Sequence, residues 1–225
     1  SGTPAIPSQT PIELASNWNW IGYVPQDPMS LATAFASIAI PNDGIDNVNF
    51  IKSQLDGTAT WYETFGWFGA LANTTLDPNK GYQLKMNSST LFYFPDDDLA
   101  AVSLDDSQNI NVLDRMGWNF NPRDYEFNGT ITLSIDNHED RSDDYIAVYV
   151  GDECRGIAEY RDFPFDNVER GIYIMMVYSN IEKGEDLTFK YYDSLKDEII
   201  SYTENIEFTS DMIIGDGFKP FSLSR

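Results

Sequence analysis

The chain has 225 residues, enough for one large domain or two of ordinary size, and its hydrophobic fraction of 42% excludes wholesale disorder. Its 36 acidic and 14 basic residues give a formal net charge of -22, which repels nucleic-acid phosphates and anionic lipid and argues against both as partners. No apolar run approaches the ~20 residues of a membrane-spanning helix, and a single cysteine excludes an intrachain disulfide or a cysteine-rich zinc site. The acidity favours binding of cations such as Ca²⁺ or, alternatively, solubility in salty or secreted settings.

The first half of the chain predicts a small α+β domain over residues 15–118. Residues 1–14, with three prolines, predict an extended lead-in or linker. Alternating aromatic and β-branched residues at 17–24 predict a strand, and apolar residues at helical spacing predict a short helix over 30–38. Turn signals and further β-forming aromatic runs then follow, the turns at 41–44 and 77–81 and the runs at 59–71, 82–86 and 90–94.

The second half, residues 119–225, predicts an antiparallel β-sandwich. The expected fold class is therefore mainly β, a small α+β N-terminal domain followed by an antiparallel β-sandwich. The central feature of this half is a hairpin with one buried face, in which the alternating runs 145–150 and 155–160 flank a glycine-bearing turn. Further short strands are expected at 127–135, 171–179, 187–192 and 199–202.

Aromatic side chains supply the candidate ligand-binding residues. Flat rings stack on the C–H faces of sugars while polar neighbours bond the hydroxyl groups. Trp18 and Trp20, two residues apart on one predicted strand, are expected on the same face. Trp61 and Trp67 join them only if the strands are adjacent, and Tyr82 is the fifth candidate. The alternative is that these rings fill the core, as large aromatic residues commonly do.

The acidic stretch 136–144 supplies the candidate metal ligands. These are Asp136, Asp140, Asp143 and Asp144, whose carboxylate oxygens are of the type that Ca²⁺ prefers. The stretch lacks the central glycine and the closing bidentate glutamate of an EF-hand loop. A generic Ca²⁺ site between strands and a solvated loop are therefore both open interpretations.

The turn of the central hairpin carries Asp152, Glu153 and Arg155. We expect a structural network in which Arg155 reaches a carboxylate with two hydrogen bonds. Cys154 is expected to be a small buried apolar group. No catalytic set is predicted, because His138 is the single histidine and 36 acidic residues will always place some carboxylates close together.

Several motifs resemble a known pair of modules. The segments NWNWIGY, GWFGAL and LDPNKGYQLKM resemble a module that is common in secreted multidomain proteins of Bacteroidetes-type bacteria. The hairpin from Asp144 to Gly156 and the strand from Leu187 to Asp193 resemble a partner module that often follows it. The chain departs from the pattern at Asn79, where glycine is frequent, and at Gln83, where an aromatic residue is usual. The resemblance covers most of the chain from about Trp18 and implies secretion and cell-surface display, often beside polysaccharide-handling or adhesive domains. It implies no catalytic activity.

We therefore expect a secreted or cell-surface module of a larger protein that is not an enzyme and that binds a polysaccharide or another extracellular ligand through exposed aromatic rings. The alternative is a structural spacer or adhesion module that calcium stabilises. A polysaccharide hydrolase is the third hypothesis, and it requires two carboxylates that converge in a cleft. Ca²⁺ is the one cofactor considered, and the expected partners are a glycan and further domains of the parent protein.

Overall fold

Strands make up 55% of the residues that the structure describes, which confirms the predicted mainly-β class. Among the described residues there is one short α-helix, and the sheets do not close into a barrel. None of the described helices has the length and apolar character needed to cross a bilayer. For Val48, Asn49, Glu159 and Arg170 the backbone alone is described. The computed structural model describes residues 5–38, 48–62, 66–96, 116–136, 143–163 and 170–224.

The chain divides into two compact units, Ser1–Asp106 and Ser107–Arg225. The sequence places the boundary later, between residues 118 and 119. Trp118 packs within the second unit, in one buried cluster with Tyr145 and Tyr149. An aromatic residue at the end of the predicted first domain therefore belongs to the core of the second unit.

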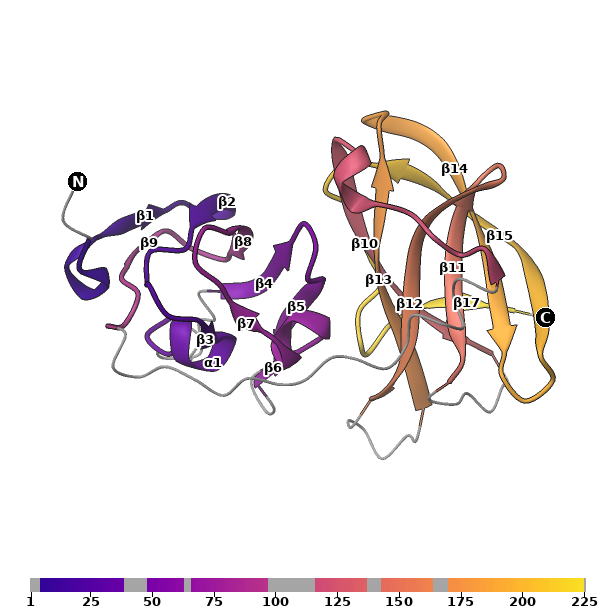
Figure 1. The fold of residues 1–225 in the computed structure, drawn as a ribbon, viewed down its shortest axis with the longest axis horizontal. Coiled ribbons are helices and arrows are strands. Elements are labelled where there is room, and N and C mark those ends of the chain that lie inside the picture. Colours follow the sequence, from indigo (N-terminus) through magenta and orange to yellow (C-terminus); the bar gives the residue numbers. More distant parts are fainter. Residues whose placement is uncertain are drawn as a thin grey trace. The chain divides into compact units, whose positions relative to one another are not determined.

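Two pairs of short strands and one larger sheet build the first unit. Strands β2, β8, β4, β5 and β6 form a five-stranded antiparallel sheet in that order, while β1 pairs with β9 and β3 with β7. The elements, shown in Figure 1, are η1 (Pro7–Gln9), β1 (Ile12–Leu14), β2 (Asn17–Gly22), β3 (Met29–Ser30), α1 (Leu31–Ala34), β4 (Val48–Ser53), β5 (Thr58–Tyr62), β6 (Gly66–Phe68), η2 (Ala70–Asn73), β7 (Thr75–Leu76), β8 (Gly81–Met86) and β9 (Thr90–Phe92).

The helix predicted over 30–38 is only four residues long. Ser30 caps it, because its side-chain oxygen accepts a hydrogen bond of 3.1 Å from the backbone N–H of Thr33. Serine and threonine compete for backbone hydrogen bonds, which favours a capped turn over a continued helix. The apolar spacing still marks a buried face, since Leu31, Ala34, Phe35 and Ile38 are all buried.

The core of the first unit lies on one face of the five-stranded sheet. Ile21, Ile51, Tyr82 and Leu84 project from β2, β4 and β8 into this core, and α1 and β9 cover them. Phe35 stacks on Phe92 with ring centroids 5.2 Å apart. Side chains alternate between the two faces of a strand, so the residues between these core positions lie on the opposite face.

An eight-stranded sheet forms the second unit. Its strand order is β15-β14-β11-β12-β13-β10-β16, and β17 also pairs with β10. The pairing is antiparallel, as expected, except at β10, where β16 and β17 both run parallel to it. The elements are η4 (Pro122–Asp124), β10 (Phe127–Ile135), β11 (Tyr145–Val150), β12 (Glu153–Phe163), β13 (Arg170–Ser179), β14 (Lys183–Asp193), β15 (Glu198–Thr209), β16 (Ile213–Ile214) and β17 (Phe221–Leu223).

This sheet wraps around a single core (Figure 1). Phe189 on β14 and Phe221 on β17 lie far apart in the strand order, yet their ring centroids are 6.0 Å apart. Tyr173 on β13 and Tyr191 on β14 meet in the same way at 6.4 Å. The two ends of the sheet therefore face each other across buried side chains.

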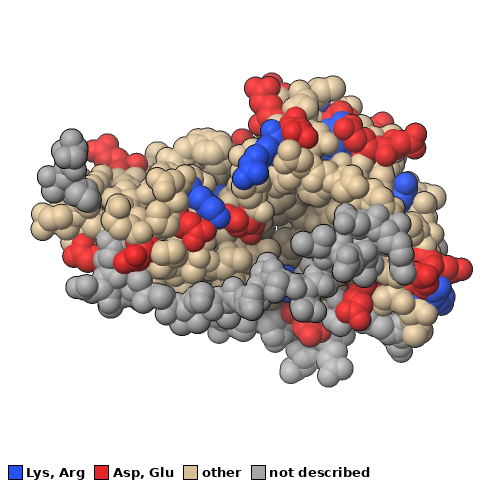
Figure 2. All heavy atoms as spheres, in the orientation of Figure 1, with Lys and Arg blue, Asp and Glu red and all other residues tan. Residues whose placement is uncertain are grey.

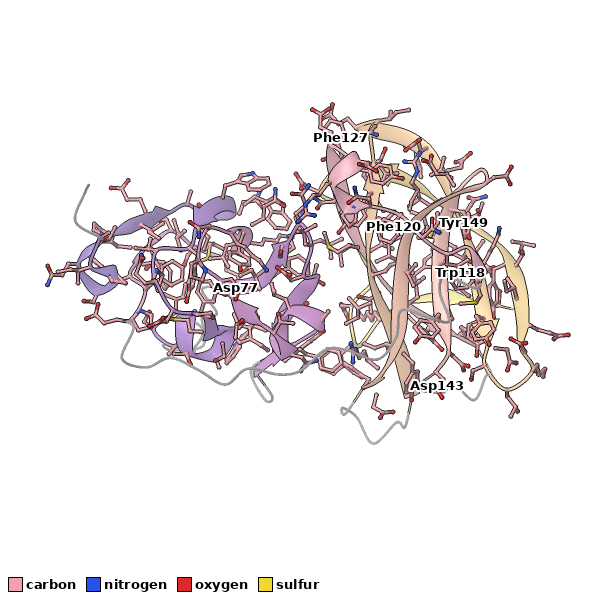
Figure 3. All side chains as sticks on the ribbon, viewed as in Figure 1. Asp77, Trp118, Phe120, Phe127, Asp143 and Tyr149 are labelled. Carbon is pink, nitrogen blue, oxygen red and sulfur yellow. The ribbon has the colours of Figure 1, made fainter. Side chains whose placement is uncertain are left out.

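Strand β11 is buried on both faces. Ile146 and Val148 enter the main core, while Tyr145 and Tyr149 pack on the other side with Trp118 (Figure 3). The prediction of a hairpin with one buried face is therefore wrong for this strand. The segment that leads into the second unit covers the face that was expected to meet solvent.

Candidate functional site

The candidate site is the outer face of the five-stranded sheet, which we define as the residues of β2, β8 and β4 that lie opposite the core. In the strand register, Trp18 lies opposite Lys85 and Trp20 opposite Gln83. The sheet continues through β8 to β4. The outer face consists of Trp18, Trp20, Gln83, Lys85, Phe50 and Lys52.

Two tryptophans mark the edge of this face, because β2 is the end strand of its sheet. Trp20 is 76% exposed, and Trp18 is half-buried. Phe50 meets Trp18 edge to face, with ring centroids 5.9 Å apart and an angle of 88° between the rings. Ile21 follows Trp20 on β2 and is buried in the core on the opposite face, which fixes the strand. Trp18 is therefore held in place, and Trp20 presents its ring to solvent.

Polar groups flank the two indoles. The Lys52 Nζ lies 4.9 Å and the Lys85 Nζ 5.7 Å from the centroid of the Trp18 ring, so both ammonium groups can make cation–π contacts. Gln83 is 6% exposed, and its Oε1 is buried without a hydrogen-bond donor. An unsatisfied buried acceptor costs roughly 1–3 kcal/mol, and because this oxygen is shielded from solvent, a ligand does not reach it in this structure.

The other three aromatic candidates lie on the core side of the same sheet. Strands β5 and β6 do bring Trp61 and Trp67 together, with ring centroids 5.6 Å apart. Trp67 is buried, however, and Trp61 packs against the core. Tyr82 is fully buried, and this burial raises its pKa to about 12. Trp67 and Tyr82 are enclosed and cannot stack on a sugar, and Trp61 is half-buried against the core with its Nε1 shielded, so Trp18 and Trp20 remain as the candidates on the outer face.

Ion pairs hold the turn before β8, which lies within the segment LDPNKGYQLKM. The Lys80 Nζ lies 2.9 Å from Asp56 Oδ2 and 2.8 Å from Asp77 Oδ2, and so ties the β4–β5 turn to the turn before β8. Partial burial by itself lowers the pKa of Lys80, but hydrogen bonds and charge from Asp77 and Asp56 raise it overall. Asn79 adopts a φ of 66°, a left-handed conformation that asparagine tolerates better than most residues, which accounts for the departure from glycine. This cluster is structural.

The hairpin motif of the second unit is also structural. Arg155 is 7% exposed, and its Nη2 donates to Glu153 Oε2 at 2.9 Å and to Glu185 Oε1 at 3.3 Å. The guanidinium also lies over the Tyr125 ring, 4.9 Å from its centroid. The prediction that Arg155 binds a carboxylate is confirmed. The second carboxylate comes from Glu185 on β14, not from Asp152.

Cys154 and Gly156 explain the rest of this motif. Cys154 is buried as expected, its Sγ donates to the Gly156 carbonyl at 3.7 Å, and burial raises the pKa of the thiol. A Cβ on Gly156 would lie 2.2 Å from the carbonyl oxygen of Met176, so β12 and β13 meet too closely there for any side chain.

The described candidate calcium ligands do not converge. Asp144 is fully buried, accepting hydrogen bonds from the Tyr191 hydroxyl at 2.5 Å and from the Ser194 N–H at 2.9 Å. Asp136 accepts a hydrogen bond from Ser222, and Asp143 is exposed (Figure 3). Asp140 lies outside the described residues. Within the part of the chain that is described, no group of three potential ligands gathers, and calcium binding stays a prediction.

Comparison with protein families, curated proteins and solved structures finds no match to this chain. The function is therefore argued from the geometry of the outer face. Sequence reasoning missed Phe50, Lys52, Gln83 and Lys85 as members of this face. The alternation of Gln83 and Lys85 with apolar neighbours in YQLKM was the available signal for the two on β8.

Proposed function

We propose that this chain is a non-catalytic extracellular module that binds a polysaccharide through the outer face of its five-stranded sheet. The observation that carries the proposal is the 76% exposed indole of Trp20, two residues from Trp18 on the same face. A sugar ring would stack on the exposed indole.

The exposed area of Trp20 is large enough to matter energetically. A tryptophan side chain buries about 200 Å², and at about 25 cal/mol per Å² three quarters of it corresponds to roughly 4 kcal/mol. Single exposed apolar residues such as Leu195, at 69%, are ordinary on protein surfaces. Trp20 differs because a second indole and several polar groups surround it.

The rest of the molecule acts as a scaffold in this proposal. We infer a small α+β domain for the first unit and a β-sandwich for the second, whose wrapped sheet encloses the main core. The carboxylate pairs Glu153/Glu185 and Asp56/Asp77 each hold a cation between them, which suits a structural role better than hydrolysis. The resemblance to secreted modules supports an extracellular or cell-surface location beside further domains.

The test is binding to a glycan panel and to insoluble polysaccharides, followed by affinity measurements on Trp20→Ala. We expect Trp20→Ala to weaken binding about tenfold to thirtyfold, the loss of a central aromatic contact worth about 1.4–2 kcal/mol. Its stability should change by less than about 0.5 kcal/mol because the residue is exposed. The Trp67→Ala variant is unsuitable, since it removes a buried ring and is expected to unfold the unit.

Tyr93→Ala is the matched control. Tyr93 is a 39% exposed aromatic residue of the same unit, but it follows β9 and lies outside the five-stranded sheet. Its removal should leave the affinity unchanged. Equal losses in Trp20→Ala and Tyr93→Ala, or no retention of any polysaccharide, would contradict the proposal and favour a spacer or adhesion module.

A further inference from the structure

The outer face differs in charge from the rest of the protein. The chain has 36 acidic and 14 basic residues, and red acidic side chains are spread over the visible surface of both units (Figure 2). On the outer face, in contrast, the charged residues are Lys52 and Lys85, and the strand register places no Asp or Glu there. Such a concentration of positive charge in an acidic protein requires an explanation.

Both lysines lie close to the indole of Trp18, the half-buried neighbour of the exposed Trp20. Their ammonium groups are 4.9 Å and 5.7 Å from the centroid of Trp18. Lys52 is buried, whereas Lys85 is only partly buried and forms no ion pair with any residue that the structure describes. Lys85 is therefore the cation that a ligand can reach, one strand away from the two tryptophans.

We propose that the ligand of this face is an acidic polysaccharide, one whose sugar rings carry carboxylate or sulfate groups. This inference rests on the proposed function and specifies its ligand class. A sugar ring stacks on Trp20, and its anionic group contacts the Lys85 ammonium. Lysine acts as a point charge, so it serves a carboxylate and a sulfate alike.

The net charge of -22 does not prevent this contact. At an ionic strength of 0.15 M the Debye length is about 8 Å, so carboxylates elsewhere on the surface are largely screened while Lys85 acts at contact distance. An exposed ion pair of this kind increases affinity by up to about fivefold. At 1 M salt the Debye length falls to about 3 Å, and the advantage of the charged ligand should vanish.

The experiment compares polymers that differ in charge alone. A polyuronate is paired with its fully methyl-esterified form, and a sulfated galactan with its desulfated form. Binding to the full chain is measured by calorimetry or affinity electrophoresis at 0.15 M and at 1 M NaCl. We expect threefold to fivefold tighter binding of at least one charged polymer than of its neutral partner at 0.15 M, and no difference at 1 M.

Three variants assign the preference to Lys85. Lys85→Met keeps the aliphatic stem and should abolish the preference for the charged polymer over its neutral partner, whereas Lys85→Arg should retain it. Lys183→Met carries the same change in net charge on β14 of the second unit and should behave as the unmodified chain. A preference that survives in Lys85→Met, or equal binding of charged and neutral polymers, overturns the inference and leaves the proposed function standing. Binding to none of the four polymers overturns the inference as well, and the broader glycan panel then decides the proposed function.

Discussion

Replacing Arg155 with alanine should strongly destabilise the second unit. Arg155 is 7% exposed and bonds to Glu153, to Glu185 and to the Tyr178 carbonyl. The Glu185 side chain is 13% exposed, so removal of Arg155 leaves a nearly buried carboxylate without its cation. Such a loss usually lowers the free energy of unfolding by about 3–5 kcal/mol. Ser179 still donates to Glu185, which places the expected loss at the lower end, about 3 kcal/mol.

The matched control is Glu153→Gln. The Glu153 side chain is 63% exposed, so water replaces much of its interaction with Arg155 and the loss should stay below about 1 kcal/mol. Urea unfolding followed by far-UV circular dichroism measures both variants. For a unit of this size, 3 kcal/mol corresponds to a fall in Tm of roughly 12 °C.

A double variant tests the reason for the loss. Arg155→Met combined with Glu185→Leu removes both charges and should recover most of the stability, because apolar replacements for a buried ion pair are often neutral. The reasoning is refuted if Arg155→Ala loses less than about 1 kcal/mol, or if the double variant is as unstable as Arg155→Ala.

Two further predictions concern the cluster on the second face of β11. Trp118→Ala should cost about 3–5 kcal/mol, because Trp118 is 2% exposed among buried aromatic rings; a loss below about 1 kcal/mol in thermal unfolding would contradict its place in this core. Cys154 should resist alkylation, because it is buried and its raised pKa leaves less thiolate at pH 8 than a free cysteine has. Its rate of iodoacetamide labelling should rise with pH and reach that of free cysteine in urea, whereas fast labelling of the native protein at pH 8 would contradict this assignment.

Local patterns in the sequence predicted part of the candidate site. The alternation in NWNWI is enough to place Trp18 and Trp20 on one face of a strand. The same rule applied to YQLKM separates Tyr82, Leu84 and Met86 from Gln83 and Lys85, and the first group is buried. The alternation in the sequence was therefore sufficient to assign Tyr82 to the core.

Nonlocal contacts account for most of what the sequence could not predict. Trp61 and Trp67 were hypothesised to join Trp18 and Trp20 if their strands were adjacent, but which face of the sheet they occupy depends on the register from β5 through β4 to β8. Glu185 is 30 residues from Arg155, and no spacing rule connects them. The apolar run YIAVYV is typical of a strand buried on both faces, yet the identity of its cover, Trp118, depends on tertiary packing.

The most direct test of polysaccharide binding by the outer face is the response of the five indole N–H signals in a ¹⁵N–¹H spectrum during titration with a bound polysaccharide. Single Trp→Phe variants assign the signals. Trp18 and Trp20 should shift, while the rings of Trp61, Trp67 and Trp118, which pack in or against the cores, should not. Shifts confined to the enclosed rings, or saturation of binding with the Trp18 and Trp20 signals unmoved, would contradict the account.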